Sequence, residues 1–348
     1  IALYPTEDNH TEDTTVTWQV GYIKYLDASL DSANVDRYVN RIKSIAEADE
    51  IVYTGDLYTD AAAHTNVKNL FIPANVTEID ASAFTGLVNL EAITVEDGNE
   101  RYYVKDSCLI DKETNTLILG CRSSIIPTDG SVVEIGDYAF FGRRNLASIE
   151  IPDSVSSIGD YAFAECPHLY SVKVWNTAIS TNQSDKVGEN AFPVQTDVIY
   201  IECTGDCGAS ESDDVHWYAY YSGNSVETEK FYTAVIYGSG VVKNGTGAII
   251  VDEIQKKNQP HYVNQLRYLM IEDGVTKIAD GAFTGLGDLD RISFGHDVKY
   301  IGDMAFAGSS QDNRSKLQYV YFSGDCPVIA PTAFNNMRTE PVIKYDDN

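Results

Sequence analysis

Residues 151–174, IPDSVSSIGDYAFAECPHLYSVKV, recur along the chain with the same residue types at the same spacing. A unit this short cannot bury its apolar side chains alone, so neighbouring units must stack against it on either side. The repeat therefore predicts a one-dimensional array that grows by adding units. Each copy is centred on the phenylalanine of an Ala-Phe pair: Phe84, Phe140, Phe163, Phe192, Phe283, Phe306 and Phe334.

The apolar columns of the repeat are fixed relative to the central phenylalanine. The copies around Phe84 and Phe283 match the copy around Phe163 column for column, whereas the last copies of each array are looser. The copy around Phe140 places Arg143 in a column that is otherwise apolar. The columns around Phe163 are Val155, Ile158, Cys166, Leu169, Val172 and Val174.

The pattern IPxxVxxIGxxAFxxCxxLxxVxV resembles the BspA-type leucine-rich repeats of bacterial surface proteins. The resemblance covers most of residues 67–205 and 266–348. It implies a β-rich repeat solenoid with short helical or irregular convex segments, curved into a right-handed superhelix. Such solenoids present surfaces and carry no fixed chemistry. The resemblance also implies adhesion to host matrix proteins or to other bacteria.

The remaining sequence divides the chain around the two arrays. Alternation over 18–26, helical spacing over 32–46 and a strand at 51–53 predict an N-terminal cap. We expect array strands at 69–72, 92–95, 148–151 and 171–174. The expected domains are an N-terminal cap (1–66), a first array (67–205), a β-rich insertion or second cap-like unit (206–265) and a second array (266–348).

Two segments depart from the repeat. Phe84 and Phe140 are 56 residues apart, against 23 between Phe140 and Phe163, and the excess at about 98–127 predicts a hairpin with strands at 107–110 and 116–119. Between the arrays, FYTAVIYGSG (231–240) followed by GTGAIIV (245–251) predicts a second hairpin, and 255–266 a short helix.

Charge restricts the partners. The chain has 25 Lys plus Arg against 52 Asp plus Glu, a net charge of −27, which repels phosphate backbones and anionic membranes, so no nucleic acid is expected. No apolar run of about 18 residues predicts a transmembrane segment. No signal peptide is visible and the chain begins at Ile1, so we expect a mature, extracellular or cell-surface protein, and a monomer.

The six cysteines are too few for a dense disulfide framework. Cys203 and Cys207 are close enough in sequence to pair, and Cys108 and Cys121 flank the first hairpin, so each pair is a candidate disulfide in an oxidising compartment, with free thiols as the alternative. Cys166 occupies an apolar column, which predicts a buried and inert thiol.

Candidate chemistry is sparse. Cys166 lies two residues before His168, but a nucleophilic thiol needs a lowered pKa, which a core position opposes. Cys203, Cys207 and His216, with Asp213 or Asp214, lack the spacing typical of metal ligands. The acidic loops lack the ligand spacing of an EF-hand. We therefore expect no catalytic residue, metal or cofactor.

Surface recognition is the remaining class of function. If the columns nine and eleven residues after each phenylalanine point into the core, their neighbours point outward on one sheet face. Aromatic rings flanked by polar groups suit contacts with proteins or glycans of host or neighbouring cells. The alternative is that the rings only stack along the ladder to stabilise the strands. The candidate ligand-binding residues are Glu96, Glu150, Lys173, Trp175, Tyr200, Arg291, Tyr319 and Tyr321.

The sequence thus favours a non-catalytic cell-surface or secreted recognition protein, an adhesin that binds through its sheet face. The alternative hypothesis is a spacer or targeting module of a larger surface enzyme. A third, an enzyme housed in residues 204–265, lacks any converging set of acid, base and nucleophile.

Overall fold

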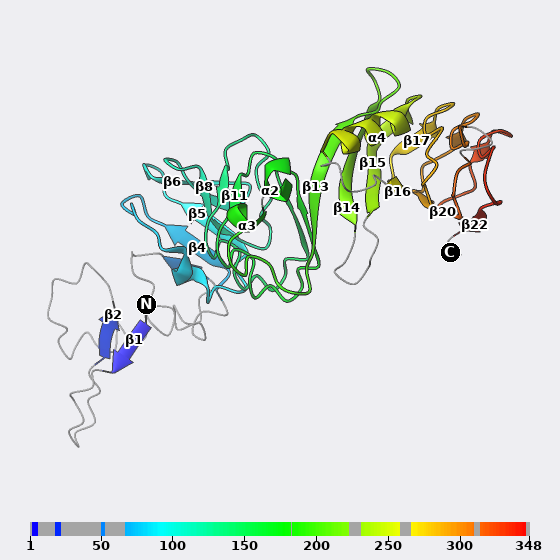
Figure 1. The fold of residues 1–348 in the computed structure, drawn as a ribbon. Helices are drawn as coiled ribbons and strands as arrows, with labels where there is room; N and C mark the ends of the chain where they lie inside the picture. Colours follow the sequence, from blue (N-terminus) through cyan, green and yellow to red (C-terminus); the bar gives the residue numbers. More distant parts are fainter. Residues whose placement is uncertain are drawn as a thin grey trace. The chain divides into compact units, whose positions relative to one another are not determined.

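The protein is β-rich with few helices (Figure 1). The computed structural model describes residues 2–5, 18–21, 50–52, 67–181, 183–222, 231–257, 266–309 and 314–345. The chain divides into two compact units, Ile1–Val198 and Ile199–Asn348, and each is described by itself.

Parallel strands from successive repeats form much of the first unit. Leu70 and Ile93 occupy equivalent positions on neighbouring strands and both side chains are buried, as the column frame predicts. The antiparallel pair is β1 (Ala2–Pro5) with β2 (Trp18–Gly21). The parallel strands are β3 (Glu50–Val52), β4 (Asn69–Ile72) and β5 (Ala92–Val95) in one sheet, and β10 (Ser148–Ile151) with β12 (Ser171–Val174) in another.

The segment inserted between Phe84 and Phe140 forms three strands, not the two predicted. Tyr102–Lys105 adds a strand that the sequence analysis missed. The last of the three strands continues the sheet by pairing in parallel with a short strand of the Phe140 repeat. These strands are β6 (Tyr102–Lys105), β7 (Cys108–Asp111), β8 (Thr116–Gly120), β9 (Glu134–Ile135) and β11 (Ser157–Ile158).

The central phenylalanines stack in the core. The ring centroids of Phe140 and Phe163 are 4.9 Å apart, and those of Phe163 and Phe192 are 5.3 Å apart. Gly120, at the end of β8, approaches this stack so closely that an added Cβ would lie 2.0 Å from the Phe140 ring. Only glycine fits there, so the inserted strands reach the stack without displacing it.

A buried arginine joins the inserted strands to the repeats. The Arg143 guanidinium donates hydrogen bonds to three backbone carbonyl oxygens, those of Gly120 (2.8 Å), Leu87 (2.8 Å) and Phe141 (3.0 Å). Its side chain is almost fully buried, and this burial lowers the pKa of Arg143 to about 10. Arg143 therefore stands where other repeats have an apolar residue, and its hydrogen bonds connect the inserted strands to the repeats.

An aspartate three residues before the central phenylalanine links successive repeats in the copies around Phe140, Phe163 and Phe283. Asp137 Oδ1 accepts a hydrogen bond from the backbone N–H of Asp160, and Asp160 Oδ1 accepts one from Glu189, both 2.7 Å long. A Cβ at Gly159 would lie 2.4 Å from Asp137 Oδ1, so the Gly-Asp pair of the repeat is a packing requirement. Asp280 accepts the same bond from Asp303 in the second unit. We call these contacts the aspartate ladder.

Short helices complete the first unit. The carboxylate of Asp80 accepts a hydrogen bond from the Ser82 backbone N–H and caps the first of them. The helices are η1 (Ala81–Phe84), α2 (Thr177–Thr181) and α3 (Gln183–Lys186).

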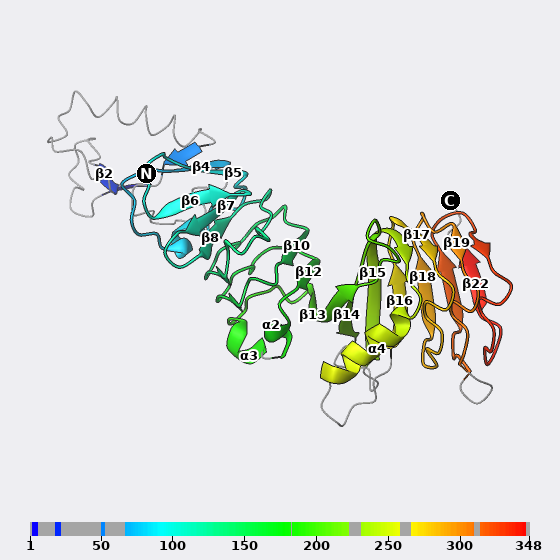
Figure 2. The same ribbon diagram turned by 90° about the horizontal axis from the view of Figure 1, so that it is seen from above.

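The second unit begins with long antiparallel strands and continues with parallel ones, which lie side by side in Figure 2. β13 (Asp197–Asp206), β14 (Asp214–Ser222) and β15 (Phe231–Val242) are antiparallel. Parallel to β15 and in this order follow β16 (Leu266–Ile271), β18 (Arg291–Phe294), β20 (Tyr319–Phe322) and β22 (Val342–Tyr345). A second row consists of β17 (Val275–Ile278), β19 (Tyr300–Ile301) and β21 (Val328–Ile329).

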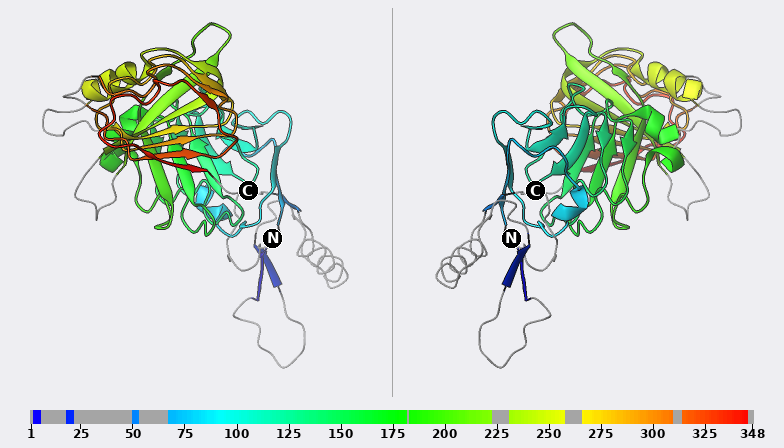
Figure 3. Two further views of the ribbon diagram at one scale, coloured as in Figure 1. Left: turned by 90° about the vertical axis from the view of Figure 1, so that its right-hand side faces the viewer. Right: turned by 90° about the vertical axis from the view of Figure 1, so that its left-hand side faces the viewer.

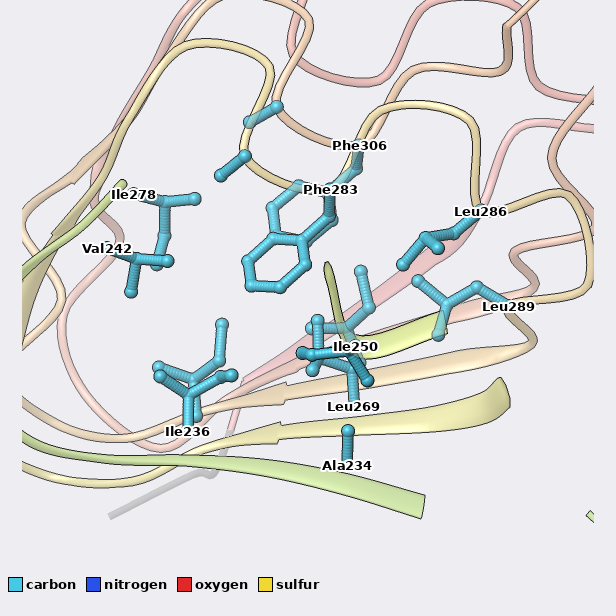
Figure 4. Close-up of a cluster of buried hydrophobic side chains, with 14 of the residues drawn as sticks. Ala234, Ile236, Val242, Ile250, Leu269, Ile278, Phe283, Leu286, Leu289 and Phe306 are labelled. Carbon is cyan, nitrogen blue, oxygen red and sulfur yellow. The ribbon is translucent and has the colours of Figure 1, made fainter. Parts of the chain in front are cut away.

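Residues 245–251 were predicted as a strand, and this prediction is wrong, because Thr246–Lys257 forms the helix α4. The edges of β15 are already paired with β14 on one side and with β16 and β17 on the other. Ile250 and Ile254, four residues apart, are instead buried in the core that contains Phe283. Figure 4 shows Ile250 in this core. The short helix predicted at 255–266 is also misplaced, since α4 ends at Lys257 and β16 begins at Leu266.

In the left view of Figure 3, the turns of the second unit from yellow to red lie over one another. Phe283, Phe306 and Phe334 stack in this order, with centroid distances of 5.2 and 5.4 Å. The curvature, the handedness and the capping roles stay predictions, as does the division into four domains. The helix predicted at 32–46 lies outside the described residues, and of the strands predicted at 18–26 and 51–53 the structure describes β2 and the end of β3.

The structure has the two candidate cysteine pairs in the alternative state, because all six cysteines are free thiols. Cys108 and Cys121 are buried and hydrogen-bonded to nearby backbone carbonyl oxygens, such as that of Glu91, 3.0 Å from Cys121 Sγ. Cys203 and Cys207 are buried in the core of the second unit. In the part of the chain that the structure describes, no helix is long and apolar enough to cross a membrane.

Candidate binding face on the sheet of the second unit

The predicted residues of the first unit form a small polar group on β10 and β12. Glu150 and Lys173 are register partners, and Lys173 Nζ lies 3.3 Å from Glu150 Oε1. Trp175 Nε1 donates a 3.1 Å hydrogen bond to Glu150 Oε2. Each of the three side chains has a partner within the unit. The charges of Glu150 and Lys173 therefore compensate each other, and the Trp175 ring beside them is half-buried.

Glu96 lies apart from that group. It is exposed, and its Oε2 accepts a 2.8 Å hydrogen bond from the backbone N–H of Ala74 in the preceding repeat. This contact is structural, because it satisfies a turn of the backbone. Tyr200 on β13 is partly buried, and burial raises the pKa of its hydroxyl.

The other three predicted residues lie together on neighbouring strands of the second unit. Arg291 on β18 is the register partner of Tyr319 on β20, and Tyr321 follows two positions along the same strand. Their side chains are half-buried, while Ile292, Val320 and Phe322 between them are buried in the core. Alternation along the strands therefore places all three on the outward face, as predicted.

Two residues that the sequence analysis missed join them. Tyr268 on β16 is the register partner of Arg291, and Lys344 on β22 is the register partner of Tyr321. The signal for Lys344 was present, since it stands ten residues after Phe334, between two core columns. Tyr268 does not follow a central phenylalanine, so the repeat pattern could not assign it to the outward face.

The two cations lie over the aromatic rings. The Arg291 guanidinium carbon lies 4.9 Å from the centre of the Tyr268 ring, 5.6 Å from Tyr319 and 5.8 Å from Tyr321. Lys344 Nζ lies 5.4 Å from the centres of both Tyr319 and Tyr321. Cation–π attraction holds the group in one arrangement. We call Tyr268, Arg291, Tyr319, Tyr321 and Lys344 the aromatic–cationic face.

The face is preorganised for contact. Tyr319 and Tyr321 are 6.2 Å apart between ring centroids, and their positions are fixed by buried neighbours on the same strand. Rings held in this way offer a large contact area at little cost in conformational entropy. The arrangement suits noncovalent binding.

The catalytic alternative is not supported by the geometry. Cys166 Sγ is buried 3.0 Å from the Phe140 carbonyl oxygen, and burial raises the pKa of this thiol to about 11. The His168 ring contacts the Tyr170 hydroxyl at 3.3 Å. A protonated core thiol is a poor nucleophile.

The polar residues considered for a metal site make hydrogen bonds within the unit. His216 lies between two carboxylates, with Nδ1 2.6 Å from Asp206 and Nε2 2.7 Å from Asp214, and both raise the pKa of the imidazole. The Asp213 carboxylate accepts hydrogen bonds from the backbone N–H groups of Ser210 and Val241. Among the described residues, no group of three or more His, Cys, Asp or Glu side chains is arranged to hold a metal ion.

Comparison with known proteins agrees with the repeat pattern. The family model described as "BspA type Leucine rich repeat region" matches residues 56–119, 110–209 and 258–344, in six copies. No curated protein matches this chain.

Three solved structures are similar to this chain. The pneumococcal vaccine antigen PcpA is 16% identical over 80% of this chain and 50% of its own, with a TM-score of 0.28. A leucine-rich repeat protein from Eubacterium ventriosum is 16% identical over 79% of this chain and 60% of its own, with a TM-score of 0.26. A leucine-rich cell surface protein from Faecalibacterium prausnitzii is 19% identical over 81% and 80%, with a TM-score of 0.23. The chain thus spans only about half of the first two proteins.

Proposed function

Because the chain belongs to the BspA-type leucine-rich repeat family, we propose that it is a non-catalytic recognition protein of the bacterial surface or its surroundings. It binds a macromolecule of a host or neighbouring cell through the outward face of its sheets. The repeats provide the scaffold, and the specificity lies in the residues that the scaffold presents.

The observation that carries this proposal is the aromatic–cationic face. Tyr and Arg are the residue types that contribute most to binding energy at interfaces. Here Arg291 lies within 5.8 Å of three tyrosine ring centres, on strands whose opposite face is packed into the core. Lys344 lies on the exposed edge strand β22, where its contact with the Tyr319 and Tyr321 rings adds little to the stability of the sheet. A purely structural role for the stacked side chains therefore does not account for it.

The test is binding of the full chain to arrayed matrix proteins, mucins and glycans. A Tyr321→Ala variant probes the second unit and a Trp175→Ala variant the first. Tyr170→Ala is the control, because Tyr170 is an exposed tyrosine outside the outward columns. Melting curves and circular dichroism establish that each variant is folded.

We expect Tyr321→Ala to lose binding to at least one class of target, with Tyr170→Ala unchanged. Loss with Trp175→Ala alone would move the site to β10 and β12. Binding that no face variant alters would overturn the proposal. Absence of binding to any class would favour the alternative of a spacer for another domain.

A further inference from the structure

Positive charge is scarce in this chain, with 25 Lys plus Arg against 52 Asp plus Glu, and several of the described cations lie beside carboxylates. The ion-paired lysines and arginines are Lys68, Arg101, Lys105, Arg122, Lys173, Lys256 and Lys316. Arg291 and Lys344 share with several other described cations the lack of an ion pair to a described carboxylate, but they alone among the described cations lie over the same two rings, those of Tyr319 and Tyr321. The aromatic–cationic face therefore combines two uncompensated positive charges in a chain whose net charge is −27.

The cations remain able to bind an anion. A guanidinium that stacks on a ring uses its flat face, and its N–H donors point outward in the plane of the group. Arg291 Nε is buried and has no hydrogen-bond partner among the described residues, so contact with a ligand falls to the terminal nitrogens of this half-buried side chain. Lys344 is exposed, and its ammonium group carries three donors.

We propose that the aromatic–cationic face binds a glycan that ends in a carboxylated sugar. Arg291 and Lys344 supply the positive charge that attracts the carboxylate, one of them donating charge-assisted hydrogen bonds to it, and the tyrosine rings pack against the apolar faces of the sugar rings. This inference rests on the proposed function and specifies its ligand class.

The charge pattern selects this class over others. A neutral glycan would leave both cations without a counterpart, and a sulfated polymer would be repelled by the net charge of −27. A single carboxylate matches the local pair of cations without that long-range penalty. Salt weakens such a contact, because much of the face is open to solvent.

The spacing of the rings also fits. Tyr268 and Tyr319 occupy the same register row two strands apart, on either side of Arg291. Parallel strands are about 4.8 Å apart, so the strands that carry Tyr268 and Tyr319 are separated by roughly 10 Å, which is comparable to the length of a disaccharide. A sugar bound over Arg291 can therefore contact a ring on each side.

The experiment compares sialyllactose with lactose, which differ only in the terminal carboxylated sugar. Binding to the full chain is measured by calorimetry or by ligand-detected NMR at low ionic strength. The variants are Arg291→Gln and Lys344→Gln, and Arg338→Gln is the control because Arg338 is exposed in the same unit outside the face. Lys344→Gln also guards against misfolding, since Lys344 is exposed at the edge of the sheet.

We expect sialyllactose to bind and lactose to bind at least about tenfold more weakly. Arg291→Gln and Lys344→Gln each reduce sialyllactose binding by about tenfold or more, and Arg338→Gln leaves it unchanged. A sulfated oligosaccharide such as a heparin fragment binds more weakly than sialyllactose.

Two outcomes overturn the inference but keep the proposed function, and a third overturns both. Equal binding of lactose and sialyllactose through Tyr321 keeps the face as a glycan site but removes the role of the carboxylate. Binding of a protein alone, lost in Tyr321→Ala, keeps the proposed function and removes the glycan. If neither sugar nor any arrayed macromolecule depends on the face, both proposals fail.

Discussion

Asp137 Oδ1 accepts a 2.7 Å hydrogen bond from the backbone N–H of Asp160, the residue at the same position of the next repeat. Asp160 in turn accepts from Glu189. Asp160→Ala should therefore lower the free energy of unfolding by about 1 kcal/mol, because a backbone donor loses its partner. Chemical denaturation measures the loss. Asp153→Ala, at an exposed aspartate of the same repeat, should change the stability by less than about half of that, and equal losses would argue against the ladder.

The buried Arg143 should be essential for the first unit. Arg143→Met removes the donors for the carbonyl oxygens of Gly120, Leu87 and Phe141 while keeping much of the volume of the side chain. We expect a loss of about 3 kcal/mol in the free energy of unfolding, measured by denaturation. The matched control is Arg144→Met, at the exposed adjacent residue. A neutral or stabilising effect of Arg143→Met would show that an apolar side chain suits this column as well as it does elsewhere.

Thiol reactivity should separate one cysteine from the rest. Cys326 is exposed, whereas burial raises the pKa of Cys108 and of Cys207 to about 12. At pH of about 8 the native chain should react with one equivalent of a thiol reagent, and all six thiols should react after unfolding. Cys326→Ser should abolish the native reaction. A second fast thiol in that variant would mean that one of the buried cysteines is accessible.

His216 should make the second unit more stable at lower pH. Its pKa is raised by the carboxylates of Asp206 and Asp214. A raised pKa in the folded state adds stability that is fully present below the ordinary histidine value of about 6.5 and is lost as the pH rises through the folded value. Melting temperatures from pH about 6 to about 9 should therefore converge between the wild type and His216→Gln. A difference in melting temperature that stays constant over this pH range would argue against the two carboxylate contacts.

The sequence predicted the repeat frame and the buried columns well. Val155, Ile158 and Leu169 are all buried. A position that is apolar in every copy is one whose side chain every copy places in the core. The same frame placed Arg291, Tyr319 and Tyr321 on the outward face.

The parts that the sequence analysis missed depend on neighbours that the local pattern does not contain. Residues 245–251 have strand-like composition, but the edges of β15 are already occupied, so the segment forms part of α4. Tyr268 joins the face through its register with Arg291, which no repeat column records. The partners of Glu96 and Trp175 likewise lie 22 and 25 residues away in the sequence.

The aspartate ladder also bears on how such a chain can change through evolution. Asp137 and its partner are 23 residues apart and Asp160 and its partner are 29 apart, yet both hydrogen bonds are 2.7 Å long. Length differences between copies are thus accommodated in the residues between successive contacts of the aspartate ladder, and the contacts themselves are preserved. Insertions and deletions between these contacts can therefore change the exposed surface of a repeat during evolution without breaking the aspartate ladder.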